Sequence, residues 1–62
     1  MAHLVITIHE KHIEFRRSRD GSQDYMGSDP TPTPKSRAER LEYLLGYFRS
    51  LNPDMTVEIL VG

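Results

Sequence analysis

Three segments of the chain alternate apolar and polar residues with the period of a half-buried β-strand. They are residues 3–9, 12–17 and 55–61. Their apolar positions are Leu4, Ile6 and Ile8 in the first segment, Ile13 and Phe15 in the second, and Val57, Ile59 and Val61 in the third. Because successive side chains of a strand point to opposite faces, each segment is predicted to bury one face.

The first two segments predict a β-hairpin, because only residues 10–11 separate them. A two-residue turn places Ile8 opposite Ile13 and Ile6 opposite Phe15, so the large apolar side chains share one face. The turn residues, Glu and Lys, do not favour the positive φ angles of the usual two-residue turns. A four-residue loop is the alternative, and it keeps the same faces.

A helix is predicted to begin at Ser36, where Ser36 and Glu39 have the spacing of a capping box directly after a proline. Apolar residues then recur at helical spacing and form one stripe. The stripe consists of Leu41, Leu44, Leu45, Phe48 and Leu51. Asn52 followed by Pro53 predicts the end of the helix, with Asn52 as a left-handed cap.

Residues 19–35 are rich in Asp, Gly, Ser, Pro and Thr, and they predict a long polar loop without regular structure. The whole chain, residues 1–62, is then a single small α+β domain with the order ββαβ. We expect a three-stranded antiparallel sheet in the order 2-1-3, with one helix packed on one face. The alternative order 1-2-3 would need a parallel pair and would leave the apolar first strand at an edge.

The composition limits how this domain can be stabilised. A chain of 62 residues removes only about 60% of its unfolded surface from water, so its core is thin. Such domains often rely on disulfides, a metal or a partner subunit. The chain has no cysteine, which excludes disulfides and zinc sites built on thiolates.

No apolar run approaches the roughly 20 residues that span a bilayer, so no membrane association is expected. The first residues lack the basic and apolar regions of a secretory signal, and we expect the mature protein to be the whole chain. The absence of cysteine is consistent with a reducing compartment. We therefore expect a cytoplasmic location.

His9 and His12 face each other across the predicted hairpin, on the face away from the core, and Glu14 follows two residues later. Two imidazoles and a carboxylate are ligands that a divalent cation accepts. The alternative is that these strand-end histidines are simply solvated, and no metal or cofactor is predicted from the pattern alone. His3 lies on the same face, but about 20 Å from His9 at roughly 3.3 Å per residue, which excludes it as a third ligand.

Six cations are predicted to gather at one end of the sheet, since the second strand ends there and the helix begins there. They are Arg16, Arg17, Arg19, Lys35, Arg37 and Arg40. With the free amides of the first helical turn they would attract phosphate or carboxylates. Nearby acidic residues offer a neutralising surface as the alternative, and the net charge of −1 argues against a grip on nucleic acid by the molecule as a whole.

Aromatic residues outside the predicted core suggest contacts with a partner. Tyr43 and Tyr47 lie four residues apart on the flank of the helix with Gly46 between them, which could form a contact ridge or merely cover the edge of the core. Tyr25 and Met26 are isolated in the polar loop. They could pack back on the domain, insert into a partner or form an exposed tip.

The sequence has no glycine-rich phosphate loop, no His-Glu-x-x-His motif and no serine in a nucleophile elbow, so enzymatic activity is not expected. Exposed strand edges and an open sheet face favour pairing with another protein or with a second copy. We therefore expect a protein-interaction module, with a homodimer as one form, acting as a small accessory or inhibitory protein of a bacterium or phage. The alternative function is nucleic-acid binding through the basic end formed by 16–19 and 35–40.

Overall fold

The predicted hairpin is present in the computed structural model, which describes residues 1–62. β1 (Ala2–Ile8) and β2 (His12–Arg19) pair antiparallel, with Ile8 opposite Ile13 and Ile6 opposite Phe15. The backbone N–H of His9 donates to the carbonyl of His12 at 2.9 Å across the two residues of the turn. Both the register and the buried face predicted from the alternation are confirmed.

The prediction of an unstructured loop over residues 19–35 is wrong, because residues Ser22–Pro30 form a further strand, β3, antiparallel to β2. The turn between them is Asp20-Gly21, and both residues have positive φ, 54° and 83°. This is the conformation that a tight hairpin turn requires, and Asp-Gly is one of its strongest sequence signals. The strand mixes polar and apolar residues on both faces, so it lacks the alternation that identifies a strand.

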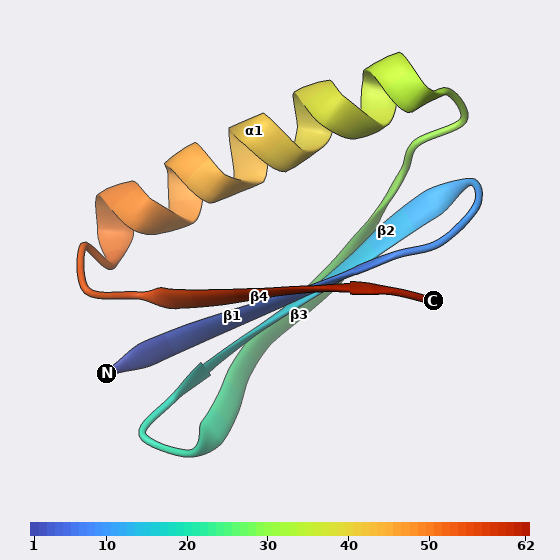
Figure 1. The fold of residues 1–62 in the computed structure, drawn as a ribbon. Coiled ribbons are helices and arrows are strands. Elements are labelled where there is room, and N and C mark those ends of the chain that lie inside the picture. The colour runs from blue at the N-terminus through green and yellow to red at the C-terminus, as the bar shows by residue number, and fades with distance from the viewer.

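The sheet has four strands in the order β3-β2-β1-β4, so the predicted three-stranded antiparallel sheet is also wrong (Figure 1). The last strand, β4 (Thr56–Val61), lies beside β1 as predicted, but the two run parallel. The extra strand explains this difference. Because β3 carries the chain back across the sheet, the helix begins at the opposite end and delivers β4 in the direction of β1.

Three residues separate the end of β3 from the helix α1 (Pro34–Leu51), which begins in a capping box different from the predicted one. Thr33 is the N-cap. Its hydroxyl accepts from the N–H of Ser36 at 3.1 Å, and the Ser36 hydroxyl accepts from the N–H of Thr33 at 3.1 Å. Pro34 occupies the first turn, where its missing N–H costs nothing. The end at Leu51 is as predicted, although Asn52 has φ −137° and is not left-handed.

The core lies between α1 and the inner face of the sheet. Its buried apolar residues are Ala2, Leu4, Ile6, Ile13, Phe15, Leu44, Phe48 and Met55. Leu41 and Leu45 pack against this cluster from the flank of the helix, while Leu51 at the helix end stays 57% exposed. An eight-residue core is small, which agrees with the limit set by the chain length.

Gly27 gives the ring of Phe15 its place in this core. A Cβ at position 27 would lie 2.7 Å from the Phe15 Cζ, so the ring packs directly on the glycine backbone of the neighbouring strand. Only glycine leaves that space.

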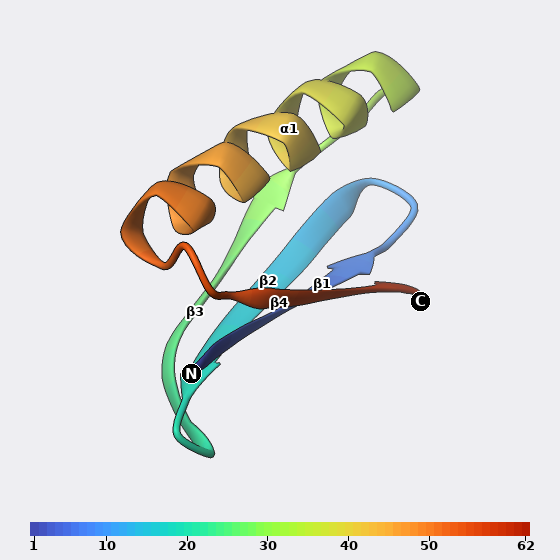
Figure 2. The same ribbon diagram turned by 60° about the vertical axis from the view of Figure 1, so that its left-hand side comes forward.

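The helix covers one face of the sheet, and it diverges from β4 toward the C-terminal end of that strand (Figures 1 and 2). Val57, Ile59 and Val61 pair with inward-facing residues of β1 and therefore face the helix side. Val57 is half-buried, but Ile59 is 48% and Val61 is 85% exposed. The far end of β4 is therefore apolar and uncovered. α1 does not combine the length and apolar character that a membrane-crossing helix requires.

Candidate functional site

The six predicted cations do not form one basic end, because the helix begins at the opposite end of the sheet from Arg19. The Arg37 guanidinium donates to the carbonyl of Glu10, at 3.0 Å, beside the β1–β2 turn. The Arg19 guanidinium donates instead to the side-chain carbonyl of Asn52, at 3.3 Å, where the helix ends. The length of the sheet separates the two groups, so the observation that favoured nucleic-acid binding is lost.

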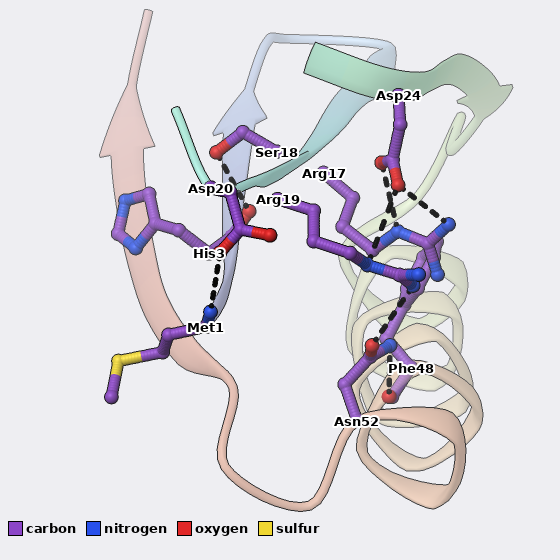
Figure 3. A network of polar contacts seen from close by, with 9 residues as sticks. All are labelled: Met1, His3, Arg17, Ser18, Arg19, Asp20, Asp24, Phe48 and Asn52. Atoms are coloured by element: carbon purple, nitrogen blue, oxygen red, sulfur yellow. Dashed lines mark hydrogen bonds and ion pairs between the residues drawn. The ribbon is translucent and has the colours of Figure 1, made fainter. Parts of the chain in front are cut away.

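Arg17 forms part of the packing between sheet and helix (Figure 3). Its side chain is only 15% exposed, and its guanidinium lies 6.0 Å from the Tyr25 ring centre and 5.8 Å from that of Phe48. Nε and Nη2 donate to the two carboxylate oxygens of Asp24 at 3.1 and 3.3 Å. The hydrogen bond from Arg17 lowers the pKa of Asp24 below its ordinary value of 3.8. The role of this arginine is structural.

Most of the other predicted cations also have partners within the chain. Arg19 lies 3.6 Å from the Asp24 carboxylate, and Arg40 lies 3.7 Å from that of Asp29. Arg16 is exposed on the open face of the sheet, and Lys35 is exposed at the start of the helix. Acidic residues therefore pair with part of the predicted cation set, and Arg16 and Lys35 have no ion pair.

Tyr25 and Met26 lie on opposite faces of β3. The Tyr25 ring packs on the core, with ring centres 5.9 Å from Phe15 and 5.8 Å from Phe48. Met26 is 63% exposed, and its sulfur accepts from the Gln23 side-chain amide at 3.2 Å. One of the two therefore packs back on the domain, and the other is free.

Tyr43 and Tyr47 stack on the outer flank of the helix, with ring centres 6.3 Å apart and an angle of 11° between the planes. Both rings are at least half exposed. They line a shallow hollow of about 540 Å³ together with Gly46, Glu39 and Glu42. The Arg40 guanidinium lies 5.2 Å from the Tyr43 ring centre. The ridge predicted from their spacing exists as a surface feature.

His9, His12 and Glu14 converge at the tip of the first hairpin as the sequence predicts. One oxygen of Glu14, Oε1, lies 2.9 Å from His9 Nε2 and 3.4 Å from His12 Nε2. The two imidazole rings stack at 4.4 Å with nearly parallel planes. His3 is remote, as expected, and pairs with Thr56 at 2.6 Å and with Glu58 at 3.4 Å.

The two edges of the sheet differ in how well they resist pairing. β3 carries three devices that block strand addition: Pro30, the charges of Asp24 and Asp29, and a bulge opposite the Arg17–Ser18 bond. β4 has no proline and no bulge, and its one charged residue is Glu58. The edge of β4 is therefore the one open to another strand.

The backbone of β4 presents its hydrogen-bonding groups outward at alternate residues. The N–H of Gly62 donates to the carbonyl of Ile8 at 2.9 Å, so the even-numbered residues of this strand face β1. The N–H and C=O groups of Val57, Ile59 and Val61 then point away from the sheet. Sequence alone missed this edge as a specific site, because which side of β4 is free follows from its parallel pairing with β1.

Two surfaces have a chemistry that suggests what they could bind: the free edge of β4, and the cluster of His9, His12 and Glu14 at the hairpin tip. The first offers unpaired backbone beside exposed apolar side chains, which suits a protein strand. The second offers two imidazoles and a carboxylate, which suit a metal ion. No protein-family model, curated protein or solved structure matches this chain. The case for both surfaces therefore rests on their geometry.

Proposed function

We propose that this chain is a non-enzymatic protein-interaction module that pairs with a second copy of itself through the free edge of β4. The observation that carries the proposal is the combination of three outward-facing backbone positions with exposed apolar side chains on the same strand. Val61, Ile59 and Leu60 are 85%, 48% and 42% exposed. Pairing would satisfy the backbone groups and remove these side chains from water at once.

The sequence of β4 is self-complementary about Ile59. In an antiparallel pair centred there, Ile59 meets Ile59 of the second copy and Val57 meets Val61. Glu58 then meets Leu60 and not its own counterpart. A register centred on Glu58 would place two carboxylates opposite each other, which is unfavourable.

The outward backbone groups select the same register. Val57, Ile59 and Val61 all carry free N–H and C=O groups, so a pair centred on Ile59 has three hydrogen-bonded positions, 57 with 61, 59 with 59 and 61 with 57. A register centred on Leu60 has only two such positions within the strand. The pairing with most hydrogen bonds is therefore also the one that avoids the contact between glutamates.

The same pairing would also bury more of the face of β4 that points toward the helix. Leu41 and Leu45 lie on the flank of α1 opposite Arg40 and Tyr47, and Arg40 contacts β3. The leucines therefore border the space above β4, into which Ile59 points. A neighbouring strand would extend the sheet beneath that flank and enlarge a core of eight residues.

Single cysteines test the pairing directly, because the chain has none of its own. In the proposed register the Cα atoms of the two Ile59 residues lie about 5.5 Å apart, within the range that a disulfide bridges. The Cα atoms of the two Leu60 residues lie roughly 8 Å apart, beyond that range. We expect I59C to form a covalent dimer rapidly under mild oxidation, and L60C to form it much more slowly.

Met26→Cys is the matched control, since Met26 is an exposed apolar residue on the opposite edge strand. It reports cross-linking by random collision. The proposal is overturned if I59C cross-links no faster than M26C. It is also overturned if the unmodified protein sediments as a monomer at millimolar concentration and instead binds DNA or RNA with an affinity that falls steeply with salt, which would assign the chain to nucleic-acid binding.

A further inference from the structure

We infer that His9, His12 and Glu14 form a binding site for a divalent transition-metal ion of the zinc class. The site lies at the tip of the β1–β2 hairpin, where the His9 ring is close to Gly62 at the end of β4. It is on the β1 side of that strand, whereas the proposed function uses the opposite, free edge. No two of the three ligand atoms are more than 4.8 Å apart.

The separations of the Glu14 oxygen from the two imidazole nitrogens are close to those of a zinc site. Ligands about 2.0–2.1 Å from a tetrahedral ion lie roughly 3.3–3.4 Å from one another. The Glu14 Oε1 atom is already 3.4 Å from His12 Nε2 and 2.9 Å from His9 Nε2. An ion between these atoms would require shifts of about half an ångström or less in the two separations from Glu14. The two imidazole nitrogens, which lie within 4.8 Å of each other, would have to approach by up to about 1.4 Å.

The His9 Nε2 atom lacks a hydrogen bond although solvent does not reach it. The carboxylate oxygen at 2.9 Å is near enough for an ion pair, but it lies off the direction of a ring N–H, so no aligned hydrogen bond forms. A shielded nitrogen without a partner is costly, and a metal ion would bind its lone pair. The same oxygen also faces His12, so one ion could contact all three groups.

Two features of the hairpin hold the ligands in place. His12 and Glu14 are alternate residues of β2 and so share a face, and His9 is brought opposite His12 by the backbone hydrogen bond between them at 2.9 Å.

The imidazole planes differ by only 12°, so the rings must rotate until their nitrogen lone pairs point toward each other to share an ion. Rotation about the Cβ–Cγ bond is soft, and the His12 side chain is 46% exposed and free to rotate.

The ligand set selects the class of ion. Two imidazole nitrogens suit zinc and its transition-metal neighbours, whereas magnesium and calcium take oxygen ligands. Three protein ligands leave one position of a tetrahedral site for water or for a group from another molecule. We therefore expect zinc to bind with a stoichiometry of one, and magnesium and calcium not to bind.

Thermal unfolding of the untagged protein with zinc chloride tests the site. Zinc at about tenfold over its dissociation constant should raise the unfolding midpoint by about 5 °C or more. H9A and E14Q should each weaken zinc binding at least tenfold in calorimetric titration. H3A is the matched control and should bind as the parent does, because His3 also pairs with a glutamate, at 3.4 Å, but has no second histidine.

All three variants change exposed or half-buried side chains outside the core, so the fold should survive, which circular dichroism without metal would verify. The inference is overturned if zinc leaves the midpoint of the parent protein unchanged. It is equally overturned if H9A and H3A reduce zinc binding by the same factor, since binding would then reflect scattered histidines. Neither result depends on the oligomeric state, so each is distinguishable from failure of the proposed pairing through β4.

Discussion

Arg17 lies where β2 passes beneath the helix, and it illustrates how a charged residue becomes part of a thin core. Its guanidinium lies beside the contacting rings of Tyr25 and Phe48, and it donates to the carboxylate of Asp24. Asp24 is the extra residue of the β3 bulge, because Arg17 pairs with Tyr25 and Ser18 pairs with Gln23. The bulge therefore directs the Asp24 carboxylate toward Arg17, with Arg19 as a second, more distant partner.

The role of Arg17 could not be predicted from the sequence, since two of its three partners, Asp24 and Tyr25, come from a strand that the sequence did not reveal. It was grouped with Arg19 as part of a surface for anions. The His9–His12–Glu14 cluster, in contrast, follows from parity within one hairpin and from a two-residue connection, and it was predicted correctly as a spatial cluster. Contacts between residues of one predicted hairpin could be predicted from the sequence, and contacts with residues of an unpredicted strand could not.

Replacement of Asp24 by Asn should destabilise the protein at neutral pH, because the amide cannot give Arg17 a charged acceptor. The pKa of Asp24 is lowered in the folded state, chiefly by the Arg17 hydrogen bond, so the stabilisation is present above its ordinary value of 3.8. It is lost as the pH falls through the lowered folded-state pKa. The difference in unfolding free energy between D24N and the parent should therefore be constant near neutrality and shrink at pH values below 3.8.

Urea denaturation at a series of pH values measures this difference. D54N is a suitable control, because Asp54 belongs to none of the ion pairs and its replacement should change stability little. A D24N penalty that is the same at pH 3 as at pH 7 would show that the loss is one of packing and not of charge.

β3 shows why an element can exist without the usual pattern. Its inner face carries Tyr25 and Gly27 beside a bulged Asp24, and its outer face carries Met26 and Ser28, so apolar and polar residues do not alternate. The strand is specified instead by its turn and by its pairing with β2. The Asp-Gly turn was the available signal, and the surrounding Ser, Pro and Asp residues hid it in a composition typical of loops.

Replacing Gly21 and Gly46 by alanine should change the unfolding free energy in opposite directions, and the first of these changes tests the β2–β3 turn. Gly21 has φ +83°, which an L-residue adopts with strain, and a Cβ there would touch nothing, so G21A should lower the unfolding free energy by about 1 kcal/mol. Gly46 lies within the helix and is equally free of neighbours, so G46A should raise it by roughly 0.5–1 kcal/mol. Chemical denaturation measures both.

The pair of variants separates the structured turn from a mobile loop. If residues 19–35 were a flexible loop, G21A would be neutral or slightly stabilising, because alanine reduces the entropy of the unfolded chain. A decrease in stability for G21A is the result that the positive φ of the β2–β3 turn explains, and the increase for G46A shows that the measurement detects stabilisation by alanine.

At the scale of the whole molecule, the direction of β4 depends on the number of strands before the helix. The sequence predicted the class, the helix and the neighbours of the first strand, because these follow from periodicity and burial. The sequence analysis missed one reversal of the chain at Asp20. For that reason it predicted the helix to begin at the wrong end of the sheet, and it predicted an antiparallel β4 where the structure has a parallel one. The separation of the cations and the free edge at Val57, Ile59 and Val61 both result from that single reversal.

The stability of the whole molecule should depend on its concentration if β4 pairs as proposed. Dimerisation of the folded chain stabilises it by mass action, and for a domain of this size the unfolding midpoint should rise by up to about 5 °C for each tenfold increase in concentration. V61K should abolish this rise, because Val61 is 85% exposed in the single chain and a lysine there disturbs only the edge. M26K places the same charge on the other edge strand and should keep the rise, since Met26 is exposed and β3 is already blocked. Calorimetric scans at protein concentrations between about 10 µM and 1 mM distinguish the two edges. If M26K loses the rise in midpoint and V61K keeps it, the interface lies at β3, and the proposed pairing through the self-complementary β4 is wrong.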